Sequence, residues 1–255
     1  MRPVRLLAAI LLLGLVSGCG KPDYDTATPE AALDSAVAMV RDGHAELLPG
    51  LVDIPARPVT FDDGVTEASA IAEVKAKAGS MLARALRTAD ALRTRFPGEA
   101  AKELKNATKK TSKGARDQIA AALADPAGWL QAQRPRLKAT DLGDGTAALT
   151  LDGQPVLAGV LTLTSTDGGW RFRVPVEVLR ESPYWPDTRP EWSVIASMML
   201  AVEHAMEDFQ RDLDRGKITS LDMASSRVGR LVGESVAVQS VIYAMMKRPD
   251  APESK

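Results

Sequence analysis

The sequence predicts an α+β fold rich in helix, in which helices cover an antiparallel meander of three to four strands and a long αα-hairpin forms the C-terminal part. Apolar residues recur every three or four positions over residues 66–95 and 190–245, which is the period of an amphipathic helix. Between residues 137 and 176 the period falls to two, as in a strand with one buried face. Aromatic residues make up only 4% of the chain, so small and aliphatic side chains must build the core, which favours close-packed helices.

The first helix is expected to begin at Pro29. Thr28 supplies a capping hydroxyl, Pro29 suits the first helical position, and Gly43 is placed to end the helix. A long helix is then expected over residues 66–95, and a further helical stretch over residues 99–123.

The period changes to two from Leu137, and short strands are predicted over residues 147–151, 156–164 and 170–174. Asp-Gly dipeptides separate these runs at hairpin spacing, which favours an antiparallel arrangement. The resulting meander needs a cover on one face, and the helices that precede it in the chain can supply one.

The C-terminal region, residues 190–248, is expected to form a helical hairpin packed on a domain of residues 29–189. The second arm carries an apolar seam formed by Leu221, Ala224, Val228, Leu231, Val238, Ile242 and Met245. Beside this seam runs a row of small residues, namely Ser225, Gly229, Gly233 and Ala237. Such a row lets another backbone approach closely, either within the fold or in a homodimer. Residues 249–255 read as a short mobile tail.

The first twenty residues have the layout of a targeting segment. Arg2 and Arg5 precede an apolar run of about a dozen residues, which is too short for a membrane span of about twenty. Small residues and then Cys19 follow. The four residues 16–19, VSGC, resemble the lipobox of bacterial lipoproteins. This resemblance implies that residues 1–18 are a signal peptide and that the thiol of Cys19 carries a diacylglycerol.

A lipid on Cys19 would decide where the protein resides. Cys19 is the only cysteine in the chain, so its thiol cannot form an internal disulfide. Two or three acyl chains hold a protein firmly on a bilayer, and residues 19–28 read as a flexible tether to the fold. In bacterial lipoproteins an aspartate directly after the lipidated cysteine favours the inner membrane. Because Gly20 occupies this position, the resemblance implies the outer membrane. The alternative is an ordinary cleaved signal peptide followed by an incidental cysteine.

Composition and motifs exclude several classes of function. The chain has 32 basic and 33 acidic side chains, so no overall basic field suggests a nucleic-acid partner. The two histidines lie on different segments, and no His or Cys cluster has metal-binding spacing. No phosphate-binding glycine loop, nucleophile elbow or dinucleotide fingerprint is present. We therefore expect no cofactor, no metal and no catalytic residue.

A second resemblance concerns residues 28–52 and 137–176. A helix initiated by Thr-Pro-Glu, a glycine stop and later strands with an Asp-Gly-Gly-Trp turn resemble the cone-shaped α+β domains of the nuclear-transport-factor-like superfamily. The resemblance implies a cone that can hold a small molecule. A pocket of that kind would be lined by strand residues such as Trp170 and Phe172.

A row of basic side chains occupies one side of the helical stretch after residue 99. Its members, at helical spacing, are Lys102, Lys105, Lys109, Lys113 and Arg116. They could contact anionic lipid headgroups or another acidic envelope surface, or they could form a solvated helix face.

Together these observations predict a lipid-anchored protein of the cell envelope, facing the periplasm. We expect a non-catalytic binding or scaffolding module whose protein partner, or second copy, docks on the C-terminal hairpin. The alternative is a small-ligand carrier or cone-domain enzyme with an internal apolar pocket.

Overall fold

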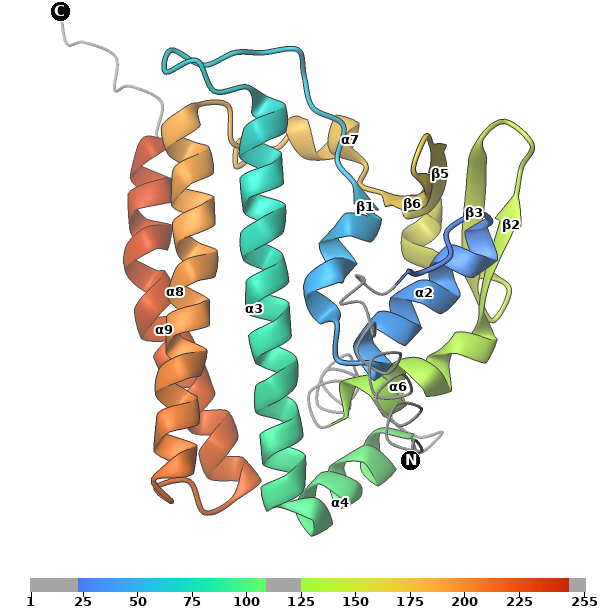
Figure 1. Cartoon of the computed structure of the whole chain (residues 1–255). Helices are drawn as coiled ribbons and strands as arrows, with labels where there is room; N and C mark the ends of the chain where they lie inside the picture. Colours follow the sequence, from blue (N-terminus) through green and yellow to red (C-terminus); the bar gives the residue numbers. More distant parts are fainter. Residues whose placement is uncertain (1–22, 109–124, 248–255) are drawn as a thin grey trace, which may run out of the picture.

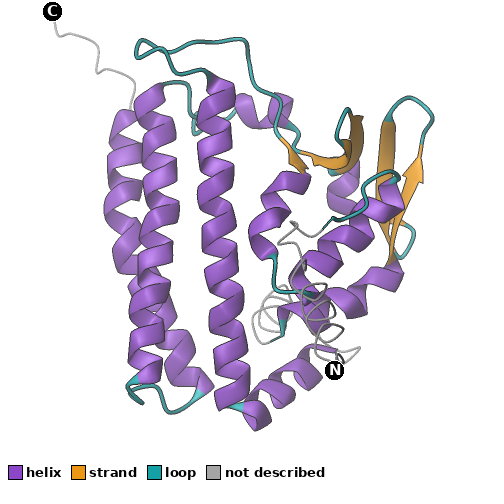
Figure 2. Cartoon of the chain, in the orientation of Figure 1, coloured by secondary structure: helices purple, strands orange, loops and turns teal. Residues whose placement is uncertain are grey.

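The computed structural model describes residues 23–108 and 125–247. Three long helices lie side by side in one layer, α3 (Glu67–Arg95), α8 (Arg189–Asp214) and α9 (Leu221–Met246), with α8 in the middle (Figure 1). Beside α3 lies an α+β part, in which α2 (Pro29–Arg41) and α6 (Pro126–Gln133) accompany a sheet (Figure 2). The predicted helix-rich α+β class with a C-terminal helix pair is confirmed.

Helices α2, α8 and α9 each begin where a side chain caps them. The Thr28 hydroxyl accepts a hydrogen bond from the backbone of Ala31, and the Ser220 hydroxyl accepts one from the backbone of Met223. At α8, Thr188 and Glu191 form a capping box, in which each side chain accepts from the other's backbone N–H. Each cap stabilises its helix by about 1 kcal/mol, which explains why these starts could be read locally.

Shorter helical segments connect the main elements. Three of them are 3₁₀ turns, η1 (Ala45–Leu51), η2 (Arg134–Arg136) and η3 (Val156–Gly159), and two are α-helices, α4 (Pro97–Thr108) and α7 (Val176–Arg180). Helix α4 covers the first part of the stretch predicted over residues 99–123, and residues 109–124 lie outside the described chain.

The sheet has more strands than the predicted three to four. Its order is β1 (Val52–Asp53), β6 (Gly169–Arg173), β5 (Thr162–Thr166), β3 (Thr146–Leu151) and β2 (Leu137–Asp141), with β4 (Gln154–Pro155) paired to β3. The meander itself is antiparallel, but β1 runs parallel to β6 and makes the sheet mixed. A two-residue strand directly after a 3₁₀ turn gives no period that a sequence pattern could reveal.

One predicted strand begins later than expected. Residues 156–159 form η3, and Gly159 adopts a positive φ of 86°, which glycine allows at no steric cost. The turn redirects the chain, so β5 starts only at Thr162.

Buried side chains form three clusters. One joins α2 to the sheet through Leu33, Leu149, Leu163 and Trp170. A second joins the end of α8 to the start of α9 around Phe209, with side chains from the end of α3 packed against it. The third joins the starts of α3 and α8 around Trp192, and its buried members include none from α9. Helix α9 is therefore covered by both α3 and α8 near its start, and mainly by α8 over the rest of its length.

Candidate functional site

The structure describes only some of the residues singled out in the sequence. Cys19 lies outside the described residues, as do Lys109, Lys113 and Arg116. Lys102 is exposed on α4. Lys105 belongs to the same helix, so a continuous basic row across this region stays a prediction.

The residues proposed to line a pocket face the core of the α+β part. Trp170 is buried beside Leu33 and Leu163, and Phe172 packs partly buried against the same cluster. A hollow of about 480 Å³ on the surface of α2 and a smaller one of about 210 Å³ between α3 and α8 both lie elsewhere, and neither is lined by Trp170 or Phe172. The pocket therefore stays a prediction.

Three of the charged side chains that line the larger hollow are already engaged by other groups. Asp34 accepts a hydrogen bond from Arg134 at 2.6 Å, and Asp25 accepts one from the backbone of Ala27 at 2.8 Å. Arg41 pairs with Asp42 at 2.8 Å, and this hydrogen bond lowers the pKa of the Asp42 carboxyl. Within the described ranges no group of three His, Cys, Asp or Glu side chains could hold a metal ion.

The histidine of α8 is exposed. His204 lies between Glu203 and Glu207 in the sequence, but both carboxylates are bound by Arg84 of α3, at 3.6 and 2.6 Å. These ion pairs join α3 to α8. His204 is therefore a residue of the helix surface, and neither neighbouring carboxylate is paired with it.

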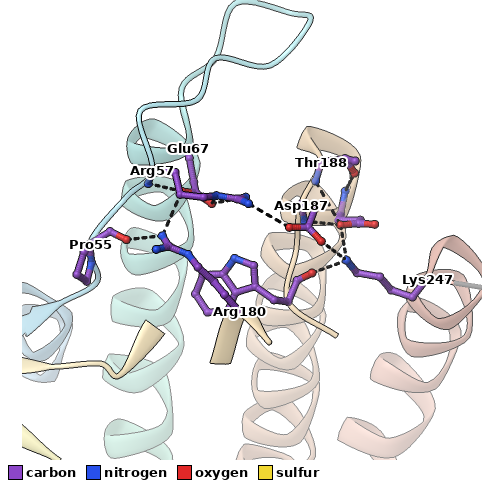
Figure 3. Close-up of polar contacts among 9 residues, drawn as sticks. Pro55, Arg57, Glu67, Arg180, Asp187, Thr188 and Lys247 are labelled. Atoms are coloured by element: carbon purple, nitrogen blue, oxygen red, sulfur yellow. Dashed lines mark hydrogen bonds and ion pairs between the residues drawn. The ribbon is translucent and has the colours of Figure 1, made fainter. Parts of the chain in front are cut away.

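A network of ion pairs connects the three long helices at one end of their layer (Figure 3). Glu67, in the first turn of α3, is fully buried and accepts hydrogen bonds from Arg57 at 2.8 Å and from Arg180 at 3.4 Å. Arg57 also reaches Asp187 at 3.2 Å. The acid lies where the positive end of a helix dipole favours it.

The network continues to the end of α9. Lys247 donates to Asp187 at 3.2 Å and to Glu191 at 2.9 Å, and it also donates to the backbone carbonyl of Trp185. The Tyr243 hydroxyl donates to the carbonyl of Tyr184 at 2.6 Å. Burial, together with the charges of Glu191 and Asp187, raises the pKa of Tyr243 to about 12.

The chemistry of this network is structural. Three cations, Arg57, Arg180 and Lys247, balance three anions, Glu67, Asp187 and Glu191, and each anion accepts at least two hydrogen bonds or ion pairs. The three carboxylates are thus engaged by the protein's own donors, while the Nε atom of Arg180 is buried without a hydrogen-bond partner among the described residues. The network fixes the C-terminal end of α9 to the starts of α3 and α8.

The opposite end of α9 is held by a second ionic contact. Asp212 of α8 is buried and accepts from Lys217 at 2.9 Å and from Arg227 of α9 at 2.6 Å. Hydrogen bonds from Lys217 and Arg227 lower the pKa of the Asp212 carboxyl. Helix α9 is thus fixed at both ends.

The side of α9 that is exposed to solvent forms its outer face. We use this name for Met223, Arg230, Glu234, Val241 and Met245, which are all exposed and follow one another by seven, four, seven and four residues, so that they share one side of the helix. Val241 and Met245 are 59% and 63% exposed. Exposed apolar side chains lie at both ends of this face, with Arg230 and Glu234 between them, and exposed apolar surface of this kind marks interaction sites.

The predicted seam of α9 is only half buried. Ala224 and Leu231 pack in the cluster around Phe209, as expected, whereas Val238, Ile242 and Met245 are exposed. The reason is that the side chains from α3 that pack on this cluster come from its far end, Ala91, Leu92 and Phe96, so only the first half of α9 gains this cover.

The row of small residues also faces outward. Ser225, Gly229, Gly233 and Ala237 are all exposed, and a Cβ added at Gly229 or at Gly233 would meet no atom within 4 Å. The row therefore does not pack the hairpin onto the rest of the fold, which excludes one of its two interpretations. The row is visible in the sequence, but whether it is buried or exposed depends on which side of α9 packs against α8.

No helix in the described part of the chain is both long and apolar enough to span a bilayer. Comparison with models of known protein families, with curated proteins and with solved structures finds no match to this chain.

Proposed function

We propose that this chain is a lipid-anchored protein of the bacterial cell envelope that acts by binding another protein, without catalysis, and that the outer face of α9 is its contact surface. The observation that carries the binding role is the exposed apolar face on a helix whose two ends are fixed by ion pairs. A rigid face is ordered before a partner arrives, so binding costs less conformational entropy.

The proposed location is supported by the sequence at residues 16–19 and by the polar segment that follows Cys19. The acyl chains would hold the fold at the periplasmic side of the outer membrane. From Asp25 onward the segment is attached to the fold, because the Asp25 carbonyl accepts from Ser35 at 2.5 Å and the Thr26 carbonyl accepts from Trp170 at 2.7 Å. The tether would thus be shorter than residues 19–28, which keeps the fold close to the bilayer.

The anchor can be tested by replacing Cys19. The Cys19→Ser variant should lose its acyl groups and leave the membrane fraction, while the parent chain pellets with membranes and gains the mass of the lipid. A Cys19→Ser variant that still pellets with lipid would contradict the anchor.

The contact surface can be tested in the tethered chain by a photo-crosslinking amino acid at Met245, with Lys138 on the exposed side of β2 as the control position. We expect a polypeptide adduct from position 245 and none from position 138. The adduct should disappear when Val241→Glu is added on the same face. An adduct that is unaffected by Val241→Glu, or no adduct at position 245, would rule out the outer face as the contact surface.

A further inference from the structure

We infer that the partner of the outer face of α9 is the same face of a second copy of this chain, packed antiparallel about a two-fold axis at the level of residue 232. This inference rests on the proposed function, since it names the partner of the same surface. It follows from the charge pattern of the face and from its size.

The charges of the face are complementary to themselves when the helix is reversed. Arg230 and Glu234 lie two residues on either side of residue 232, and Met223 and Val241 lie nine residues on either side. An antiparallel copy therefore places Arg230 against Glu234 of its partner twice, and Met223 against Val241 of its partner twice. A two-fold axis requires this reciprocity, because the same patch is used on both subunits.

Both charged side chains are available for such contacts. Arg230 and Glu234 are exposed, and neither has an ion pair with any other described residue. Their position in the middle of the face also argues against a lipid bilayer as its partner, since burying charged side chains in lipid is costly. A different protein could bind this face without the face being complementary to itself, whereas a second copy requires that complementarity.

The two glycines lie near the level of the proposed axis, but on another side of α9. Gly233 is one residue from the proposed axis and Gly229 is three residues from it. Each glycine costs a helix about 1 kcal/mol relative to alanine, and within one chain neither is needed for space. At about 100° per residue, however, Gly233 points roughly 80° and Gly229 roughly 120° away from Met223 and Val241. The proposed pairing therefore uses the charged and apolar side chains of the outer face and not the glycines.

The size of the face predicts a weak dimer. At about 1.5 Å per residue, the 26 residues of α9 extend roughly 39 Å. One pair of helices of this length forms an interface at the low end of the range for stable complexes. We therefore expect a dissociation constant of about 1–100 μM for the soluble chain. Confinement of both copies to one membrane would raise their effective concentration.

The decisive experiment uses the chain without residues 1–19 and measures its mass by sedimentation equilibrium from about 1 to 200 μM, a range that covers the expected dissociation constant. The parent should pass from monomer to dimer. Arg230→Glu alone, or Glu234→Arg alone, places like charges opposite each other twice and should weaken the dimer at least tenfold, while the double variant should restore the parent value. Lys138→Glu, on the sheet, is the charge-reversal control and should leave the dimer unchanged.

The orientation is tested by disulfide cross-linking, since this soluble chain contains no cysteine. A mixture of Met223→Cys and Val241→Cys chains should form a cross-linked dimer that neither variant forms alone. A parallel pair would cross-link each variant to itself and would overturn the inference. A monomer at 200 μM, or a double charge variant no tighter than the single ones, would overturn it as well.

The failure of this inference can be told from that of the proposed function. If the soluble chain is monomeric but position 245 still cross-links to a different protein, and Val241→Glu prevents it, the contact surface remains and the second copy is excluded. If neither experiment detects a contact, both are excluded.

Discussion

Replacing Glu67 should strongly destabilise the fold without affecting any surface. Glu67→Ala removes the acceptor shared by the backbone N–H of Arg57, the guanidinium of Arg57 and that of Arg180. Removing one partner of a fully buried ion pair costs about 3–5 kcal/mol. Here the side chains of Arg57 and Arg180 are 32% and 23% exposed, so water can solvate part of their charge. We therefore expect the free energy of unfolding to fall by about 3 kcal/mol, at the lower end of that range.

Urea unfolding followed by circular dichroism measures this loss. Glu181→Ala is the matched control, because Glu181 is exposed, caps the end of α7 and has no ion pair with another described residue. It should change the free energy of unfolding by less than about 0.5 kcal/mol. Glu67→Gln keeps the shape and one oxygen acceptor and should fall between the two. A loss below about 1 kcal/mol for Glu67→Ala would refute the view that the network holds the three helices together.

Three further outcomes follow from the same contacts. The pKa of Tyr243 is raised to about 12, against about 10 in the unfolded chain. The neutral form of Tyr243 therefore stabilises the fold below about pH 10, and this contribution is lost between about pH 10 and 12. An absorbance titration should find the last tyrosine ionising in this range, except in the Tyr243→Phe variant. The lowered pKa of Asp212 stabilises the fold above its unfolded pKa of about 3.9, so the lower melting temperature of Asp212→Asn at pH 7 should approach that of the parent as the pH falls below about 4. Gly229→Ala and Gly233→Ala should each stabilise the dilute monomer by up to about 1 kcal/mol; a destabilised monomer in urea unfolding would contradict the open space beside these glycines.

The helices could be predicted well because their signals are local. The capping box at Thr188 and Glu191 is contained in four consecutive residues, and the cap of α9 at Ser220 is equally short. The turn of the chain at Gly159 and the two-residue strand β1 could not be predicted. Strand β1 depends on its pairing with β6, in which Val52 lies opposite Phe172, and neither feature has a period of its own.

The sites were harder to predict because exposure is decided by tertiary packing. Glu67 reads in the sequence as an ordinary acid in the first turn of a helix, but its two partners lie 10 and 113 residues away. The seam of α9 continues to Met245 in the sequence although its cover ends earlier. Periodicity reports which residues share a helix face, and it does not report whether another element lies against that face.

The position of α9 explains why its face is available. Helix α9 forms the edge of the helical layer, with α8 and α3 between it and the α+β part (Figure 1). The described chain begins in the α+β part with the segment from residue 23, in which the Tyr24 hydroxyl donates to Asp42 at the end of α2. A chain anchored through that segment would leave the edge helix free to meet a neighbour in the plane of the membrane. Since ion pairs at Asp212 and Lys247 already fix the register of α9, two copies could pair there without rearranging the fold.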